Sequence, residues 1–145
     1  MNAAAYTAVD KAETEVSKAF LINEMGAKNL ATACKKLDIP LIHISTDYVF
    51  AGDATTPYLP SAGCDPKTVY GASKLAGERT IAEVLPAHLI IRTAWLYSEY
   101  ANNFAKTMLC LANERDSISV VADQIGCPTY APDLADVILA VAAKM

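Results

Sequence analysis

The chain has 145 residues, of which 53% are hydrophobic and 19% charged, and its formal net charge at pH 7 is −4. This balance excludes a disordered chain, which would combine few apolar residues with a high net charge. No apolar run approaches the roughly 20 residues that a membrane span needs, and no basic cluster indicates phosphate neutralisation. We therefore expect neither a membrane nor a nucleic-acid partner.

The first half of the chain predicts a long helix, a buried strand and a loop, in that order. Apolar residues at steps of three and four predict a helix over residues 15–38, which Pro40 ends. The residues of the expected buried face are Val16, Phe20, Asn23, Ala27, Leu30, Cys34 and Leu37. A short apolar run at 41–45 predicts a buried strand. Residues 51–67 contain two glycines and three prolines, which predicts a loop of turns.

The second half continues the alternation of helix and strand. Residues 68–85 predict a helix, and residues 88–92 predict a second strand of the buried type. Further helices are expected at 102–115 and 133–144, with a short strand at 117–121 between them. Strands that alternate with helices of this length are typical of βαβ units, so the sequence predicts an α/β fold with a parallel sheet.

The cysteines and glycines carry no recognisable binding motif. The four cysteines lie far apart, and the two histidines do not complete a zinc site, so we expect no metal, reduced thiols and a cytoplasmic location. The six glycines cannot be written as GxGxxG or as a phosphate-binding P-loop. Either a nucleotide site is built differently here, or the front of a doubly wound domain is absent.

Tyr70 and Lys74 form the most chemically suggestive pair. Four residues apart on a helix, they share a face. An ammonium near a phenol stabilises the phenolate and lowers the pKa of the tyrosine, which suits proton transfer at a carbonyl or alcohol centre. The spacing alone is weak, because chance produces it often in a chain of this composition.

Polar residues follow the first expected strand and strengthen that pair. Ser45, Thr46, Asp47 and Tyr48 lie where the strand ends, at the edge where open α/β sheets bind ligands. A hydroxyl there could hold a substrate oxygen while Tyr70 supplies the proton. The alternative is a plain strand-end turn or a helix cap.

Four further residues need an interpretation, and two of them have two. Trp95 follows the second strand and suits either stacking on a sugar or base, or a buried anchor. Asn23 is either a satisfied core amide or a hydrogen-bond partner of a cofactor or of active-site water. His43 is expected to be a core histidine, and His88 to begin a strand.

Six ordered blocks of the sequence resemble the extended short-chain dehydrogenase/reductase family, and in particular its members that reduce a keto group of a dTDP-sugar. The blocks are NAAAYTAVDKAE (2–13), HISTDYVFAG (43–52), VYGASKLAGE (69–78), IIRTAWLY (90–97), NF (103–104) and ADQIGCPTYAPDLA (122–135). The resemblance implies a Rossmann-like doubly wound parallel sheet that lacks the N-terminal glycine-rich βαβ portion. Residues 1–125 would belong to the NAD(P)-binding domain, and residues 126–145 would begin a substrate-binding region.

The same resemblance implies a Ser/Thr–Tyr–Lys site. Thr46 would orient the carbonyl, Tyr70 would donate the proton, and Lys74 would hold the nicotinamide ribose and lower the pKa of Tyr70. The implied cofactor is NADPH or NADH, and the residues matching cofactor positions are Ala5, Tyr6, Thr7, Asn23, Tyr70 and Lys74. The implied partner is a dTDP-sugar, and the residues matching substrate positions are Thr46, Asp47, Tyr48 and Trp95.

Tyr48 distinguishes among relatives, because sugar-nucleotide dehydratases of the family typically carry an acidic residue there. Two alternatives stay open: a non-catalytic member like the regulatory subunit of methionine adenosyltransferase, and another epimerase or dehydratase. The family also allows a homodimer, and a divalent ion that no residue here locates. Because the glycine-rich turn is absent, we expect the middle of an enzyme about twice as long, with little or no activity by itself.

Overall fold

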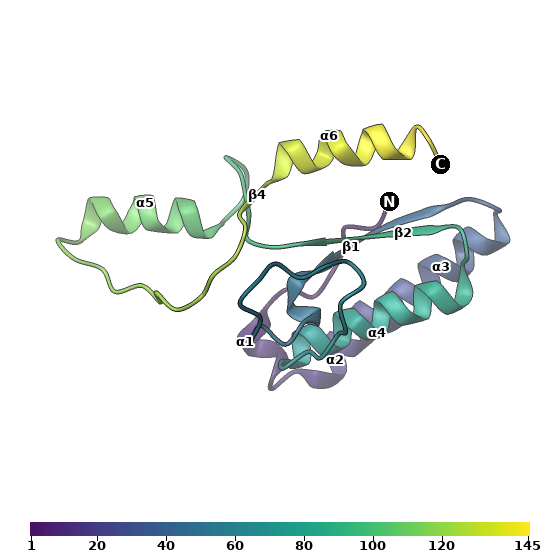
Figure 1. Ribbon diagram of the computed structural model, residues 1–145, viewed down its shortest axis with the longest axis horizontal. Coiled ribbons are helices and arrows are strands. Elements are labelled where there is room, and N and C mark those ends of the chain that lie inside the picture. The colour runs from purple at the N-terminus through teal and green to yellow at the C-terminus, as the bar shows by residue number, and fades with distance from the viewer. The chain divides into compact units, whose positions relative to one another are not determined.

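The computed structural model describes all 145 residues and divides into two compact units, Met1–Arg92 and Thr93–Met145. The helices and strands along the chain are shown in Figure 1. They are α1 (Val9–Ala12), α2 (Val16–Phe20), the π-helical turn η1 (Leu21–Gly26), α3 (Ala27–Lys36), β1 (Leu41–Thr46), the 3₁₀ turn η2 (Asp47–Val49), α4 (Val69–Val84), β2 (His88–Thr93), β3 (Leu96–Tyr97), α5 (Phe104–Glu114), β4 (Thr129–Tyr130) and α6 (Ala131–Ala142).

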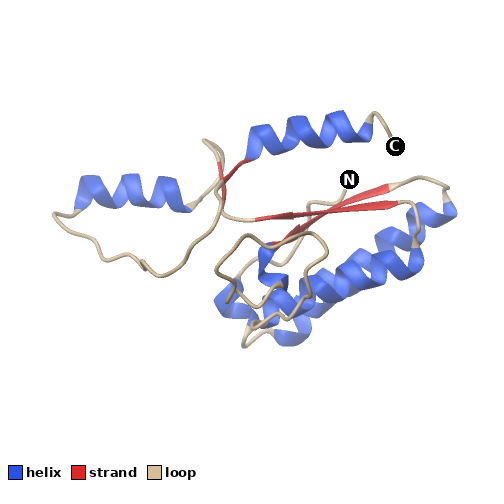
Figure 2. Ribbon diagram, in the orientation of Figure 1, coloured by secondary structure: helices blue, strands red, loops and turns tan.

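The first unit is built around a βαβ crossover. β1 and β2 are neighbours in one sheet, α4 connects them, and their arrows run in the same direction (Figure 2). The backbone N–H of Leu41 donates to the carbonyl of Ala87 at 3.1 Å, and Asn2 adds a parallel bridge to His43 on β1. Five of the six β1 residues are buried, as in a strand covered on both faces. The strands expected at 41–45 and 88–92 are confirmed.

The helix expected over 15–38 is present, but its buried face differs from the expected one. The run α2–η1–α3 spans residues 16–36, and its middle turn is π-helical. Its buried residues are Ala19, Asn23, Ala27 and Ala31, whereas Val16, Leu30 and Leu37 of the expected face are exposed. The reason is a close approach of α4. A Cβ added at Gly77 of α4 would overlap the carbonyl oxygen of Asn23, so only small residues fit along this contact.

Two apolar clusters hold the first unit together. One consists of Ala27, Ala31, Leu41, Ile81 and Leu85, with Cys34 and Val84 packed against it. The other consists of Tyr6, Ala12 and Ala19, with Val69 and Tyr70 packed against it. The second cluster places the segment before α1 directly against the first turn of α4. Packing therefore joins two segments about sixty residues apart in the sequence.

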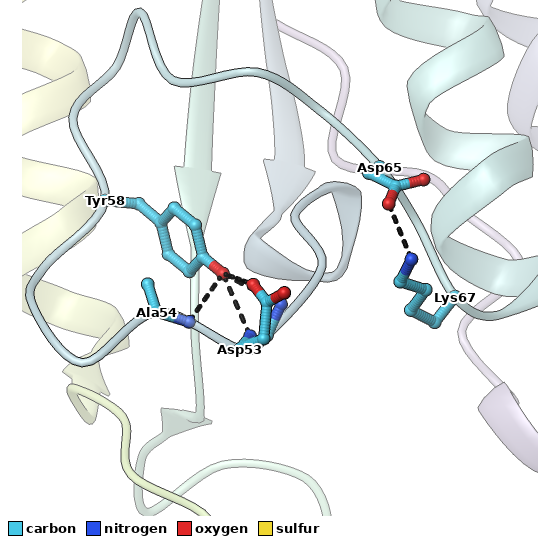
Figure 3. A network of polar contacts seen from close by, with 6 residues as sticks. Asp53, Ala54, Tyr58, Asp65 and Lys67 are labelled. Carbon is cyan, nitrogen blue, oxygen red and sulfur yellow. Dashed lines mark hydrogen bonds and ion pairs between the residues drawn. The ribbon is translucent and has the colours of Figure 1, made fainter.

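The loop at 51–67 is confirmed, and its own side chains order it (Figure 3). The backbone N–H groups of Gly52, Asp53 and Ala54 converge on the hydroxyl oxygen of Tyr58 at 2.9, 3.1 and 3.2 Å, and this hydroxyl donates to Oδ1 of Asp53. Gly52 has φ +80°, which a side chain would disfavour. The Tyr58 ring stacks on Phe50 with ring centroids 4.4 Å apart.

The second unit contains two helices and one short strand pair. β3 and β4 pair in parallel, with Leu96 opposite Thr129 and Tyr97 opposite Tyr130. The helices expected at 102–115 and 133–144 appear as α5 and α6, within two residues of their expected ends. Asn103 caps α5 by accepting the backbone N–H of Lys106 at 3.1 Å.

The strand expected at 117–121 is wrong. Residues 115–128 form no helix or strand, and Ile118, Val120 and Val121 are exposed. A strand is stabilised by hydrogen bonds to a neighbour, and no strand of this chain pairs with the segment. The apolar run predicted a buried strand, but no other segment of this chain buries these side chains.

No helix of the chain has both the length and the apolar character needed to cross a bilayer. No group of three or more His, Cys, Asp or Glu side chains is arranged to hold a metal ion. The two compact units divide after Arg92. The domain boundary expected after residue 125 from the family resemblance stays a prediction.

Candidate active site

Thr46 lies at the carboxyl end of β1, and its side chain organises the turn that follows. Its Oγ1 accepts the backbone N–H of Tyr48 at 3.2 Å and donates to Oδ1 of Asp47 at 3.1 Å. The turn-cap alternative for Thr46 is therefore realised. The cap fixes the hydroxyl at the edge of the sheet, beside the first turn of α4.

α4 brings Tyr70 to this edge through a close backbone approach. Thr68 caps the helix by accepting the backbone N–H of Gly71 at 3.0 Å. A Cβ at Gly71 would overlap the carbonyl oxygen of Tyr48, so a glycine is required where α4 meets η2. As a result the rings of Tyr48 and Tyr70 pack edge to face, with centroids 5.5 Å apart.

The environment of Tyr70 keeps its phenol protonated. Burial raises the pKa of Tyr70, and the nearby Asp47 and Tyr48 raise it further, while a hydrogen bond with Thr46 lowers it in part. The net shift is upward. The structure thus brings Thr46 and Tyr70 together, as the sequence predicted, and keeps the Tyr70 phenol protonated at neutral pH.

Lys74, one turn along α4 from Tyr70, is buried, with only 2% of its surface exposed. Its Nζ donates to the carbonyl oxygen of Ile44 at 2.7 Å and lies 3.4 Å from Nε2 of His43. Burial lowers the pKa of Lys74 to about 8, against the opposing effect of Glu78. Lys74 makes no contribution to the pKa of Tyr70. The expected lowering of the Tyr70 pKa by Lys74 stays a prediction, and in this structure burial is the largest influence on that pKa.

The sequence left two interpretations for Asn23, and the structure shows the first, a buried amide whose hydrogen bonds are satisfied. Its Oδ1 accepts the backbone N–H of Tyr6 at 2.8 Å, and its Nδ2 donates to the carbonyl of Tyr6 and to Oγ of Ser73. The π-helical turn η1 positions this amide, in keeping with the frequent occurrence of such turns at functional sites. A direct bond from Asn23 to a cofactor stays a prediction, and it would have to use the second lone pair of Oδ1.

In the segment Ala5–Thr7 the central residue is buried and hydrogen-bonded, and the two outer residues are more accessible to solvent. Tyr6 is buried, and its hydroxyl donates to Oε2 of Glu15 at 2.9 Å. Ala5 is half-buried and Thr7 is exposed. Because Asn23 clamps both backbone groups of Tyr6, the path of the segment is fixed relative to α4. Ala5 and Thr7 can therefore offer backbone and hydroxyl groups to a ligand without rearranging.

Trp95 lies in the second unit, where it is half-exposed and not a buried anchor. Its backbone has φ +48°, its carbonyl accepts the N–H of Thr129 at 3.2 Å, and Gly126 packs against its ring. It lines a pocket of about 680 Å³ whose walls include Tyr97, Phe104 and Val120. An exposed indole beside an apolar pocket suits stacking on a planar or sugar ring.

Comparison with known proteins gives the chain a family. Residues 1–145 match the family described as RmlD substrate binding domain. The chain belongs to this family. A dTDP-4-dehydrorhamnose reductase of Sinorhizobium fredii is 50% identical over 142 residues, which are 98% of this chain and 48% of that protein. The expected family resemblance is thereby confirmed.

Two solved structures of dTDP-4-dehydrorhamnose reductases confirm the Rossmann-like α/β fold. A dTDP-4-dehydrorhamnose reductase from Clostridium acetobutylicum has a TM-score of 0.96 and 45% identity, covering 99% of this chain and 51% of that one. One from Bacillus anthracis, solved in complex with NADP, has a TM-score of 0.95 and 49% identity, covering 97% and 50%. The chain thus spans about half the length of the relatives it matches.

Three residues of the site went unassigned in the sequence. Asn2 donates to His43, Ser73 accepts from Asn23, and Gly71 allows α4 to approach η2. Gly71 had a usable signal, since a glycine inside a helical pattern often marks close packing. Asn2 and Ser73 had none, because their partners lie 41 and 50 residues away in the sequence.

Proposed function

We propose that the chain carries the proton-transfer half of an enzyme that reduces the 4-keto group of dTDP-4-dehydro-L-rhamnose to dTDP-L-rhamnose. The observation that supports this most is the juxtaposition of the Thr46 and Tyr70 hydroxyls over Lys74. Relatives of 45–50% identity that carry the reductase name support the choice of reaction.

Tyr70 is the proposed acid. Reduction of a ketone leaves an alkoxide, which is far more basic than a phenolate, so a protonated phenol transfers its proton readily. The raised pKa of Tyr70 keeps that proton in place at neutral pH. The Thr46 hydroxyl, fixed by its contacts with Asp47 and Tyr48, would orient the carbonyl oxygen toward Tyr70.

The proposed cofactor is NADPH or NADH, which supplies the hydride when bound. The residues that would hold it are Ala5, Tyr6, Thr7, Asn23, Tyr70 and Lys74. What supports the fit is the clamped backbone of Tyr6, which leaves Ala5 and Thr7 presented beside the first turn of α4. A lysine ammonium is also a suitable donor to ribose hydroxyls.

The proposed substrate contacts are Thr46, Asp47, Tyr48 and Trp95. Tyr48 is 40% exposed and packs on Tyr70, so it forms part of the wall beside the acid. The resemblance implies a carboxylate at this position in the family's dehydratases, as a second acid or base, and Tyr48 does not supply one. This argues for reduction over dehydration.

We also propose a cytoplasmic location and a homodimer. All four cysteines are free, as thiols are in a reducing compartment. Light scattering of the purified chain measures its mass, and a single 15.5 kDa species at micromolar concentration would contradict the dimer.

Ligand binding to this chain tests the proposed function. A ligand at about 100 times its dissociation constant stabilises the native state by roughly 2.7 kcal/mol. We expect dTDP-rhamnose or NADPH to raise the midpoint of thermal unfolding. A cooperative transition that neither ligand moves would favour a non-catalytic member of the family instead.

Tyr70→Phe separates catalysis from binding. Because the phenol supplies the proton, we expect any measured oxidation of NADPH by the keto sugar to fall by about 10²- to 10⁴-fold, with the ligand-induced shift in unfolding retained. Tyr58→Phe is the matched control, since it removes a phenol of the loop and should leave the rate unchanged. Equal rates in both variants would exclude Tyr70 as the acid.

A further inference from the structure

Arg92 lies near the carboxyl end of β2 and contacts separate parts of the first unit. Its Nε and Nη2 donate to the two carboxylate oxygens of Glu78 on α4, at 3.0 and 2.6 Å. Nη2 also donates to Sγ of Cys64 at 3.4 Å, and Nη1 donates to the carbonyl of Pro60 at 3.5 Å. The guanidinium carbon lies over the ring of Phe50, 4.9 Å from its centre. One side chain therefore joins β2, α4 and the loop that precedes α4.

The ion pair with Glu78 orients the guanidinium group. The Glu78 side chain is 5% exposed and the Arg92 side chain 24%, so the pair is largely shielded from water. Two N–H groups that bond the two oxygens of one carboxylate fix the plane of the guanidinium as well as its position. Its other contacts then point in set directions, and the loop supplies the partners there.

Phe50 extends this contact into the loop. Its ring stacks on that of Tyr58, with 5° between the ring planes. The Tyr58 hydroxyl in turn holds the backbone N–H groups of residues 52–54 (Figure 3). A continuous series of contacts therefore runs from Arg92 through two aromatic rings to the first turn of the loop.

The same contact reaches η2, which carries Tyr48. The backbone N–H of Phe50 donates to the carbonyl of Asp47 at 2.9 Å, so Phe50 closes this turn. A 3₁₀ turn of three residues has few hydrogen bonds of its own and depends on anchors at its ends. The Thr46 side chain anchors the start of η2. Phe50, held by Arg92, anchors its end.

We infer that Arg92 is a positioning residue, which holds the loop 51–67 and the end of η2 against α4 and so fixes the wall that Tyr48 forms beside the acid. Its importance for substrate binding rests on the proposed function, in which Tyr48 contacts the dTDP-sugar. A purely structural role makes a different prediction. In that case Arg92 only neutralises the buried carboxylate of Glu78, and any cation at this position serves equally well.

Arg92→Lys separates the two roles. A lysine ammonium keeps a positive charge beside Glu78, but it lacks the planar fork and cannot also lie over Phe50. We expect backbone hydrogen exchange over residues 47–54 to accelerate about tenfold, because a cation–π contact and loop hydrogen bonds are lost together. Exchange over residues 72–84 of α4 should keep its original rate. Mass spectrometry of peptic fragments measures both regions in one experiment.

Two further variants control this experiment. Arg79→Lys makes the same change at an exposed position of α4 and should alter neither region. Phe50→Leu leaves the pair of Arg92 with Glu78 in place and removes the ring, so it should accelerate the same amides. It also keeps the test decisive where Arg92→Lys fails to fold. In the double variant the two effects should add to less than their sum, because both changes remove one shared contact.

Calorimetric binding of dTDP-rhamnose and of NADPH extends the test to the site. Where the chain binds both, we expect Arg92→Lys to lose affinity for dTDP-rhamnose and to keep its affinity for NADPH. The reason is that Tyr48 is a proposed substrate contact, whereas the proposed cofactor residues lie outside η2 and the loop. An unchanged affinity for dTDP-rhamnose, or an equal loss for both ligands, would overturn the role of Arg92 at this wall.

The outcomes separate the inference from the proposed function. Unchanged exchange over residues 47–54 in folded Arg92→Lys and Phe50→Leu would overturn the inference, since a cation beside Glu78 would then suffice. Equal acceleration over residues 72–84 would overturn it too, because it would show general loosening. Acceleration confined to residues 47–54 supports it, even where the chain binds neither ligand. In that case the proposed function fails while Arg92 still positions the loop.

Discussion

The two compact units differ in how many polar and apolar side chains they bury. The first unit buries Asn2, Asn23, His43, Ser73 and Lys74, and hydrogen bonds link them into two groups that converge on α4. The second unit buries almost nothing, with Ile138 its single buried hydrophobic residue and Ile125 100% exposed. Proton-transfer groups need fixed neighbours, and only the first unit provides them.

The sharpest test of this contrast is a pair of isoleucine truncations. Ile81 is 0% exposed in the core of the first unit, so Ile81→Ala should cost about 4 kcal/mol in the free energy of unfolding. Ile125→Ala, in the second unit, should change it by less than about 0.5 kcal/mol. Urea unfolding followed by far-UV circular dichroism measures both. Similar losses in the two variants would remove the contrast.

Tryptophan fluorescence follows the unfolding of the second unit alone, because the single tryptophan, Trp95, lies in that unit. Ile81→Ala should therefore lower the midpoint of the dichroism signal. The tryptophan signal reports whether the second unit follows.

A glycine pair tests the close approach of α4. Gly77→Ala would press a methyl group into the carbonyl of Asn23, and we expect a loss of about 3 kcal/mol. Alanine normally favours a helix by up to about 1 kcal/mol over glycine, so the sign itself is diagnostic. Gly63→Ala, where nothing lies within 4 Å of the added atom, is the control and should be nearly neutral. Stabilisation by Gly77→Ala would show that the helices can separate at no cost.

Acid should weaken the first unit through His43. Its pKa is about 4 in the folded chain and 6.5 without burial, so between these values the unfolded chain binds the proton and the folded chain does not. Stability is therefore lost as the pH falls from about 6.5 to 4, by roughly 2 to 3 kcal/mol. Unfolding of the chain and of His43→Gln across this range measures the difference. Parallel pH profiles would place the acid sensitivity elsewhere.

Local patterns in the sequence were enough for most of the elements. The apolar run at 41–45, the loop with its glycines and prolines, and the periodicity of α4 depend on neighbours within a few residues. The resemblance likewise brought Thr46 and Tyr70 together correctly. These features need no knowledge of distant contacts.

The failures have one cause, which is contact between distant segments. The inward face of α2–η1–α3 is lined with alanine because Gly77 requires it, and Lys74 turns to Ile44 and His43 because β1 passes beneath it. The run at 117–121 looked like a strand, yet no strand of this chain pairs with it. Each outcome depends on which segments meet, and spacing within one segment does not contain that information.

The π-helical turn η1 limits changes in chain length. Such a turn already holds one more residue than an α-helical turn, and a residue added to or removed from the regular α-helical part of this run would rotate α3 by about 100° relative to α2. Ala27 and Ala31 would leave the contact with α4, and bulky neighbours would enter it. Nothing lies within 4 Å of an atom added at Gly63, and the loop around it has no helical register to preserve. Insertions and deletions should therefore accumulate in that loop among related sequences, and the run from α2 to α3 should keep a constant length.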